Sequence, residues 1–506
     1  MANLKSLAKD TAIYGLSSIV GRFLNYLLVP LYTAKMTAAS GDYGIVTNAY
    51  AYTALLLAIL TYGMETTFFR YANSDDEDPR QVYSTTLITV GCTSLLFVLL
   101  VVSCIGWIAP AMGMAYAQHP SYIIAMAIVV ALDAFQAIIF AYLRYKKKAV
   151  KFAALKLLFI FLNIGLNLLY FVALPAIYAV HPTWVSGIYD PAVGVGYVFY
   201  LNLACVVAVM PCMWRELADA SLQWSAPLLR RMLGYSWPIL ILSVAGVINQ
   251  SASQIIFPFI YPGDAVETAS QLGIYGAAIK IAMIMALITQ AFRYAYEPFV
   301  FGNNRNKANE AENKAMQATA TKYFLIFTLI AFLAVIAGID LLKFIIAPDY
   351  WVGLKVVPIV MAAEIMMGLY FNLSFWYKLT DRTLWGAVIS SIGCLMLVLV
   401  DVLFIPHYGY MACAWAGVAA YGTAMLISYF MSQRYYPVNF PLRDMGLYAL
   451  LAALLTAAAL VVTVNHVWLR MAYRLFLLAL FCGVVAKREH MGRMLARMPV
   501  VGRLMR

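Results

Sequence analysis

Stretches of about twenty mostly apolar residues recur along the whole chain, and each is long enough to cross the roughly 30 Å hydrocarbon core of a bilayer as a helix. Of the 506 residues, 64% are hydrophobic and only 11% are charged, so a water-soluble fold has no room for this apolar surface. No strand-length alternation runs through the stretches, and lipid tolerates only helices or closed barrels. The sequence therefore predicts an all-α integral membrane protein of about fourteen spans. Their expected limits are 11–34, 43–69, 82–108, 120–143, 152–175, 194–214, 232–257, 270–296, 321–345, 354–377, 384–405, 408–432, 444–464 and 468–486.

Basic residues are distributed unevenly between the two sets of alternating loops. Of the 35 Lys and Arg, 28 fall on the side of the N-terminus, 5 on the other side and 2 within spans. By the positive-inside rule, this alternation predicts a cytoplasmic N-terminus, and an even number of spans returns the basic tail to the same side. The net charge of +12 therefore reflects topology, and no nucleic acid partner is expected. The alternation is broken mainly by four cations on the outer side: Lys343, Lys355, Arg470 and Arg474.

A short repeat links the two halves of the chain. The sequence F-R-Y-A occurs at 69–72 and again at 292–295, where spans two and eight end. Both copies begin in the cytoplasm, so the repeat is parallel and predicts two six-helix lobes around a central cavity. The expected domains are an N-lobe at 1–214 with spans one to six, a cytoplasmic linker at 215–231, a C-lobe at 232–434 with spans seven to twelve, and residues 435–506 with two further helices and a basic cytoplasmic tail.

Charged side chains within spans are candidate functional groups, because each costs about 2.5–3.5 kcal/mol to insert at the centre of a helix. Arg22 lies near the middle of the first span with Asn25 on the same face, and Lys280 lies in the eighth span. Gln250 belongs to a polar face of the seventh. These residues, together with Glu65, predict a cavity that binds an anion.

The alternative is that Arg22 and Lys280 pair with buried carboxylates, of which Glu65, Asp133 and Glu364 are available. Glu65, close to the cytoplasmic end of the second span, is expected either to pair with Arg22 or to help gate the inner side. Asp133 and Glu364 are candidates for ion coupling and, equally, for structural hydrogen bonds.

Two arginines end the repeated spans at the cytoplasmic surface, Arg70 and Arg293. We expect them to anchor the helices at the interface, and the alternative is that they contact a head group at the inner mouth of a cavity. Glu297, four residues after Arg293, is placed to form a helical salt bridge with it.

Motifs of catalysis are missing from the chain. It has no Walker A sequence, no HExxH and no GxSxG in a suitable strand–turn–helix setting. The five His and seven Cys show no metal-ligand spacing, so we expect no catalytic residue, metal or cofactor. The loops are also too short for the large external loop that a membrane-embedded glycan polymerase or ligase usually carries. A non-enzymatic scaffold in a glycan-export complex stays open.

Several short motifs at the ends of spans one, two and eight resemble a known family. They are LKSLAKDTAIYG at 4–15, VPLY at 29–32, DYG at 42–44, GMETTFFRY at 63–71 and AFRYAYEPF at 291–299. This set resembles the bacterial polysaccharide flippases of the Wzx type, which belong to the multidrug/oligosaccharidyl-lipid/polysaccharide (MOP) exporter superfamily.

The resemblance implies two six-helix lobes that alternate in access, in the bacterial cytoplasmic (inner) membrane. It also implies export of an undecaprenyl-pyrophosphate-linked oligosaccharide for O-antigen, capsule or exopolysaccharide synthesis. The implied partners are that lipid-linked substrate, membrane lipids, H⁺ or Na⁺ as coupling ion, and glycan-polymerase or export proteins.

Two alternatives within the superfamily stay open. Fourteen spans exceed the twelve of the commonest members, and peptidoglycan-precursor flippases carry extra C-terminal helices, so lipid II is a second candidate substrate. A drug or cation antiporter of the MATE type needs a carboxylate in its cavity, whereas the first span offers Arg22 and no acid.

Overall fold

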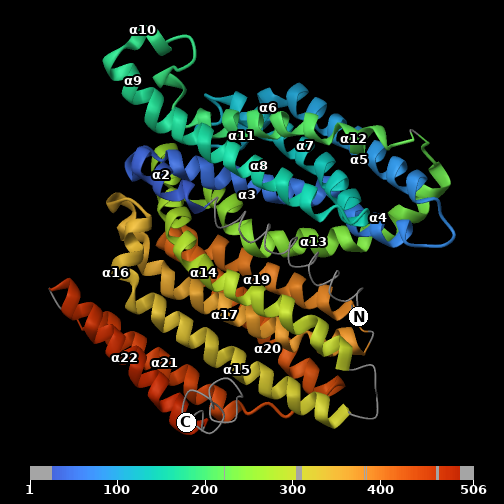
Figure 1. Ribbon diagram of the computed structural model, residues 1–506. Helices are drawn as coiled ribbons and strands as arrows, with labels where there is room; N and C mark the ends of the chain where they lie inside the picture. The colour runs from blue at the N-terminus through green and yellow to red at the C-terminus, as the bar shows by residue number, and fades with distance from the viewer. Residues whose placement is uncertain are drawn as a thin grey trace, which may run out of the picture. The chain divides into compact units, whose positions relative to one another are not determined.

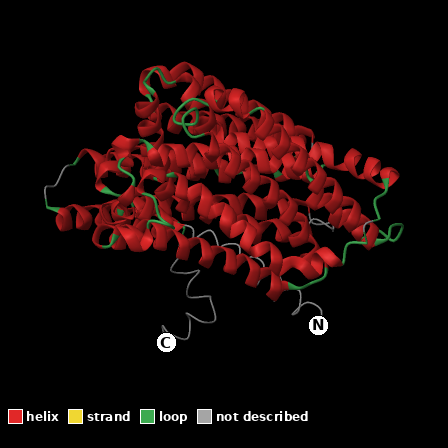
Figure 2. Cartoon of the chain, turned by 90° about the horizontal axis from the view of Figure 1, so that it is seen from above, coloured by secondary structure: helices red, strands yellow, loops and turns green. Residues whose placement is uncertain are grey.

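The computed structural model describes residues 26–221, 223–303, 310–380, 382, 384–462 and 466–489. Regular structure in this part of the chain is entirely helical, without a strand (Figure 2). Thirteen of its helical segments are long and apolar enough to cross a membrane, and each overlaps one of the predicted spans. The largest difference is at Glu310–Ala337, for which the sequence predicts 321–345. The remaining prediction, at 11–34, lies mostly outside the described residues, and α2 (Leu28–Lys35) covers its end. The prediction of an all-α membrane protein is confirmed.

The chain divides into two compact units (Figure 1). The first combines Met1–Ala277 with Leu397–Cys413, and the second combines Ala278–Met396 with Ala414–Arg506. The division passes through three helices, α14, α19 and α20, so each of them contributes residues to both units.

The first unit holds twelve described helices before α14. They are α2, α3 (Asp42–Thr61), α4 (Met64–Ala72), α5 (Pro79–Ser103), α6 (Ile105–Ala111), α7 (Pro120–Tyr145), α8 (Ala149–Leu168), α9 (Leu174–Val180), α10 (Pro182–Val185), α11 (Gly196–Val209), α12 (Trp214–Ala218) and α13 (Ala226–Ile260). The helix α13 begins at Ala226, within the stretch 215–231 that the sequence suggests as a linker. The side chain of Ser225 caps this start by accepting a hydrogen bond from the backbone N–H of Leu228 at 3.4 Å.

The second predicted span is two helices, α3 and α4, separated by a break at Tyr62 and Gly63. Both residues have positive φ, 32° and 73°, a conformation that costs most residues about 1–2 kcal/mol but that glycine adopts readily. Space also demands glycine here, since a Cβ on Gly63 would lie 2.8 Å from the Cβ of Ile239 on α13. The break gives α4 its own direction, and α4 carries Glu65 and Arg70.

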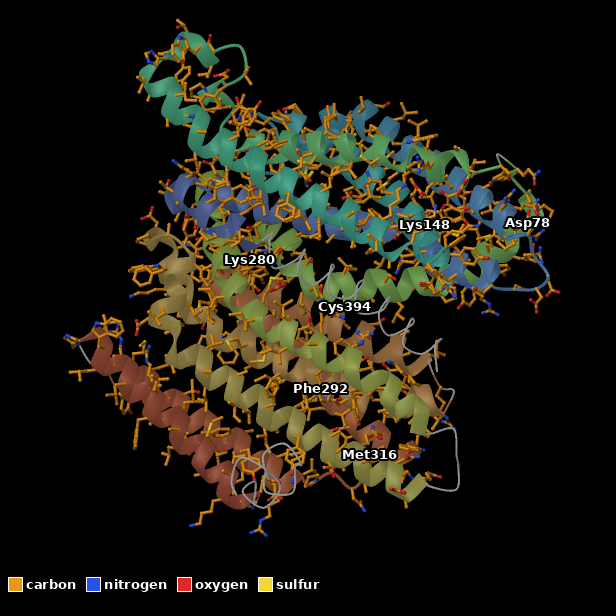
Figure 3. All side chains as sticks on the ribbon, viewed as in Figure 1. Asp78, Lys148, Lys280, Phe292, Met316 and Cys394 are labelled. Atoms are coloured by element: carbon orange, nitrogen blue, oxygen red, sulfur yellow. The ribbon has the colours of Figure 1, made fainter. Side chains whose placement is uncertain are left out.

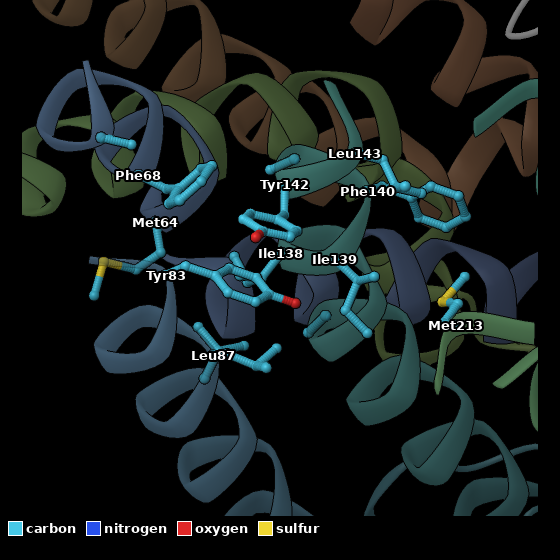
Figure 4. Close-up of a cluster of buried hydrophobic side chains, with 14 of the residues drawn as sticks. Met64, Phe68, Tyr83, Leu87, Ile138, Ile139, Phe140, Tyr142, Leu143 and Met213 are labelled. Carbon is cyan, nitrogen blue, oxygen red and sulfur yellow. The ribbon is translucent and has the colours of Figure 1, made fainter. Parts of the chain in front are cut away.

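The core of the first unit fixes α4 in that direction (Figure 4). Met64 and Phe68 on α4 are both fully buried, and Phe68 packs edge-on against Tyr83 of α5. Tyr83 in turn stacks on Tyr142 of α7, with ring centroids 3.9 Å apart. Full burial of a side chain such as Phe68 contributes about 1.5–3 kcal/mol.

The second unit contains the remaining helices, of which α14, α19 and α20 also contribute residues to the first unit. They are α14 (Ala265–Asn303), α15 (Glu310–Ala337), α16 (Ile339–Leu342), α17 (Val357–Leu373), α18 (Phe375–Leu379), α19 (Leu384–Tyr408), α20 (Tyr410–Tyr435), α21 (Leu442–Val461) and α22 (Val467–Arg488). The C-terminal pair α21 and α22 packs together and against α15. At one end of this packing, Lys322 of α15 forms an ion pair with Glu489 at 2.6 Å. Burial opposes ionisation of Glu489, but hydrogen bonds from Lys322 and Tyr448 outweigh it and lower the pKa of the carboxyl.

Candidate functional site

Three of the predicted site residues lie outside what the structure describes. Arg22 and Asn25 precede the first described residue, and the side chain of Glu297 is not described although its backbone belongs to α14. The other seven can be placed.

Glu65 pairs with a cation of its own unit. Its Oε1 accepts a hydrogen bond from Nη2 of Arg144, at the end of α7, to form an ion pair. The Arg144 guanidinium also lies over the ring of Phe69, 5.1 Å from its centroid. The break at Gly63 and the burial of the neighbouring Met64 and Phe68 hold Glu65 against α7.

A second cation, Lys156 of α8, lies close to this pair. Its Nζ is 4.0 Å from the ring centroid of Phe140 on α7. Lys156 interacts electrostatically with Asp133 of α7 as well as with Glu65 and Arg144. The four charged groups therefore form a balanced network of two cations and two carboxylates within the first unit.

The third carboxylate that the sequence offered is Glu364, on α17 in the second unit. Its Oε2 is buried and has no hydrogen-bond partner among the described residues. Tyr421 of α20 lies within electrostatic range of it. Glu364, like Glu65 and Asp133, forms no ion pair with Lys280.

Lys280 lies on α14, and Phe292 follows it further along the same helix (Figure 3). Its side chain is partly buried and makes no ion pair within the described part of the chain. A charged lysine within a span that has no carboxylate partner costs free energy unless it lines a water-filled cavity or contacts an anion. The arrangement disfavours structural pairing of Lys280 with the three available carboxylates.

Arg293 lines a small pocket of the second unit, with a cavity volume of ≈ 10 Å³, which is room for about one water molecule. The Arg293 guanidinium lies over the ring of Phe371 on α17, 4.7 Å from its centroid, and Lys378 of α18 lies over Phe375. Two cations thus border an aromatic pocket. Its lining residues are Thr289, Phe292, Arg293, Tyr296, Phe324, Gly368, Phe371, Asn372, Ser374, Phe375 and Lys378.

The two remaining candidates belong to the first unit. The Arg70 guanidinium stacks over Tyr235 of α13, 4.1 Å from the ring centroid, so it joins α4 to α13. Gln250 is exposed on α13. Arg70 and Arg293, the equivalent residues of the repeat, each lie over an aromatic ring of a neighbouring helix.

Charged residues within spans that sequence reasoning missed include Lys156 and Asp401. Asp401 of α19 is fully buried, and its carboxylate faces Ser253 of α13. Neither oxygen of Asp401 has a hydrogen bond of good geometry among the described residues. The rule that singled out Lys280 applies equally to both, because each lies inside a predicted span. In the described chain no group of three or more His, Cys, Asp or Glu is arranged to hold a metal ion.

Comparison with solved structures shows the fold. The chain is similar to the lipid II flippase MurJ in an inward closed conformation, with a TM-score of 0.72 and 13% identity over 94% of this chain and 99% of that one. It is also similar to an inward-facing multidrug resistance MATE family transporter of the MOP superfamily, with a TM-score of 0.60 and 15% identity over 81% of this chain and 93% of that one. Both likenesses show that the chain has the fold of these two proteins.

Sequence comparison shows the family. No curated protein matches the chain. The model of the family described as polysaccharide biosynthesis protein matches residues 7–293, which is more than half of the chain. The predicted resemblance is confirmed, and the chain belongs to the polysaccharide biosynthesis protein family, with the fold of MOP-superfamily transporters.

Proposed function

We propose that this protein is a flippase that moves an undecaprenyl-pyrophosphate-linked oligosaccharide from the cytoplasmic to the outer leaflet of the bacterial inner membrane. It works by alternating access, is not an enzyme and uses no cofactor. The observation that carries the proposal is Lys280, a cation within a span that has no ion-pair partner in the described chain. Arg22 is its expected counterpart in the first span.

The chemistry of the substrate supports this use of a cation within a span. A pyrophosphate head group cannot cross hydrocarbon unaided, and charge-assisted hydrogen bonds to Arg or Lys replace its hydration. The lipid tail stays in the bilayer while the head group passes. With a negative-inside potential, outward movement of an anion is favoured by about 2.3 kcal/mol per charge per 100 mV. Arg293 and Lys378, the two cations that border the small aromatic pocket, offer a first contact for the head group on the cytoplasmic side.

The proposed orientation places both termini in the cytoplasm. Support comes from the alternation of basic residues between loops, because 28 of the 35 Lys and Arg fall on that side. In this orientation Arg70, Arg293 and Lys378 lie at the cytoplasmic ends of their helices.

A proton or sodium ion resets the empty carrier. Support for this step comes from carboxylates in spans that lack a full complement of partners, namely Glu364 and Asp401. Asp401 is fully buried, and a carboxylate enclosed in this way is too costly to keep as a bare anion, so it binds a proton or a cation. Asp133 is the weaker candidate, since Lys156 already balances its charge.

Lipid II is a second candidate substrate, favoured by the likeness to the lipid II flippase over 94% of the chain. Lipid II also carries a pyrophosphate, so Lys280 and Arg22 would serve either substrate. A MATE-like exchange of cationic drugs is less well supported, because a cationic substrate gains nothing from an unpaired Lys280.

The test is genetic replacement by Lys280→Ala and Arg22→Ala variants in the native host. We expect surface glycan to be lost and lipid-linked oligosaccharide to accumulate at the cytoplasmic leaflet, with normal amounts of the variant proteins in the membrane. Arg230→Ala is the matched control, because Arg230 is an exposed cation outside the predicted spans. Normal surface glycan in both variants contradicts the proposal. Accumulation of lipid II with unchanged surface glycan would instead identify the second substrate.

A further inference from the structure

One carboxylate, Asp340, joins α16 to the C-terminal helix α22. It accepts hydrogen bonds from Nε and Nη2 of Arg470, both at 2.7 Å, and from Nη1 of Arg474 at 3.0 Å. The Nζ of Lys343 lies 3.7 Å from the same carboxylate. These four residues are called the Asp340 cluster. Lys343, Arg470 and Arg474 are three of the four cations that break the predicted charge alternation.

The Asp340 cluster carries more positive than negative charge. Three cations share one carboxylate, and in the described part of the chain no second carboxylate lies within ion-pair distance of Lys343 or Arg474. The cluster is also poorly hydrated, since the side chains of Asp340 and Arg474 are only 9% and 10% exposed. Cations held away from water without counter-charge are unfavourable unless an anion joins them.

Two members of the cluster keep donors for such an anion. Arg474 uses Nη1 for Asp340 and Nε for the backbone carbonyl of Ala459 at 3.3 Å, which leaves Nη2 available. Lys343 is too far from Asp340 for a hydrogen bond, and its Nζ lies over the ring of Trp351 at 4.4 Å. A guanidinium beside an ammonium group suits the oxygens of a phosphate.

The position of the cluster indicates where the anion comes from. The cluster follows the end of α15 and lies at the start of α22. Lys322, in the first half of α15, instead pairs with Glu489, which directly follows the other end of α22. Large apolar side chains around it are exposed, including Leu341, Phe344 and Trp468. Exposed apolar residues around a cationic cluster at the end of spans are expected where lipid covers the surface.

We infer that the Asp340 cluster binds the phosphate of a lipid head group, through Arg474 and Lys343, in the leaflet opposite to Lys322. In the proposed orientation, the leaflet opposite to Lys322 is the outer leaflet. Only this choice of leaflet rests on the proposed function. The lipid is either an anionic membrane phospholipid or a polyprenyl phosphate. The bound phosphate completes the charge balance that holds α22 against α16.

The test is native mass spectrometry of the full-length protein in detergent with phosphatidylglycerol, undecaprenyl phosphate, phosphatidylethanolamine or inorganic phosphate added. The Lys343→Gln and Arg474→Gln variants are compared with wild type. Lys343→Gln keeps every hydrogen bond of Asp340, so it should fold normally. Arg488→Gln is the matched control, because Arg488 lies on the same helix but pairs with Asp444 one to one at 2.6 Å.

We expect wild type and Arg488→Gln to retain an anionic lipid in preference to phosphatidylethanolamine. Retention should fall about tenfold in Lys343→Gln and at least as much in Arg474→Gln, as for loss of one charge-assisted hydrogen bond. The anionic lipid that wild type retains more strongly identifies the lipid whose phosphate the cluster binds. Equal retention in wild type and both variants, no preference for anionic lipid, or binding of inorganic phosphate alone overturns the inference.

Discussion

Glu65 on α4 bonds to Arg144 at the end of α7, and the break in the second span at Gly63 is what brings the two residues together. A straight helix continued from α3 would point Glu65 elsewhere. The network that includes Lys156 and Asp133 therefore depends on one left-handed glycine.

Gly63→Ala should lower the stability of the protein by at least about 1–2 kcal/mol, because alanine is strained at positive φ. The added Cβ also meets Ile239 at 2.8 Å. Thermal unfolding in detergent measures the effect. Gly246→Ala on α13 is the control, since a Cβ there meets nothing within 4 Å, and its Tm should stay the same or rise. Equal Tm values for the two variants would contradict a strained break.

Glu65→Gln and Arg144→Gln should each destabilise the protein by about 0.2–1 kcal/mol, a modest effect because both side chains keep contact with solvent. The exchanged double variant, Glu65→Arg with Arg144→Glu, should recover part of the loss. A double-mutant cycle on thermal unfolding provides the coupling energy. Strictly additive effects would show that the ion pair contributes nothing.

Lys378→Gln should weaken substrate recognition at the pocket that Arg293 also lines. Loss of one charge-assisted contact corresponds to about 1.5–3 kcal/mol, so the apparent KM for transport should rise about tenfold or more. The transport rate at saturating substrate should change little. Lys314→Gln serves as the control, because Lys314 pairs with Glu310 at 2.8 Å away from this pocket. A KM equal to that of wild type would remove Lys378 from the site.

The Asp340 cluster should make stability depend on pH only in the acid range. Burial disfavours the charged carboxylate, but the hydrogen bonds and charges of Arg470, Arg474 and Lys343 outweigh it and lower its pKa. Because the folded protein holds the proton less tightly than the unfolded chain, this contribution is full above about pH 4 and is lost as the pH falls through the lower folded pKa. Tm measured against pH should drop below about pH 4.

The variant Asp340→Asn should show a reduced Tm at neutral pH and a smaller acid-induced drop than wild type. It keeps the shape of the side chain and removes the charge that the three cations share. An acid-induced drop identical to that of wild type would mean that other carboxylates cause it.

Asp401→Asn should reduce the dependence of transport on an ion gradient. The substitution is nearly isosteric in a fully buried site, so the fold should be retained. Transport is measured with and without an imposed H⁺ or Na⁺ gradient. The loss of stimulation by one ion identifies the coupling ion, and unchanged stimulation by both excludes Asp401 from coupling.

Much of the fold could be predicted from the sequence, because length and hydropathy alone determine where a chain can cross a bilayer. The limits 120–143 and 384–405, for instance, agree with α7 and α19 to within about three residues. The break at Gly63 could not be predicted, since a glycine inside a span is compatible with a straight helix. Only the packing of α13 shows that Ile239 leaves no space for a side chain at this position.

The candidate site was only partly predictable. Lys280 could be found because a charge inside an apolar stretch is visible in the sequence. Lys156 follows the same rule, but it lies beside the basic loop that holds Lys148 and Lys151 and so resembles a loop cation. The pairing of Glu65 with Arg144 joins residues 79 positions apart, and such a pairing emerges only from the packing of α4 against α7.

The most direct test of the central claim is reconstitution of the purified protein in liposomes that contain an undecaprenyl-pyrophosphate-linked oligosaccharide on one leaflet. Appearance of the head group on the other leaflet is followed with a membrane-impermeant lectin or glycosidase. The proposed function predicts translocation by wild type and by Arg230→Ala, and a ten- to hundredfold slower rate for Lys280→Gln, as for loss of one charge-assisted contact. Translocation by Lys280→Gln at the wild-type rate would contradict it.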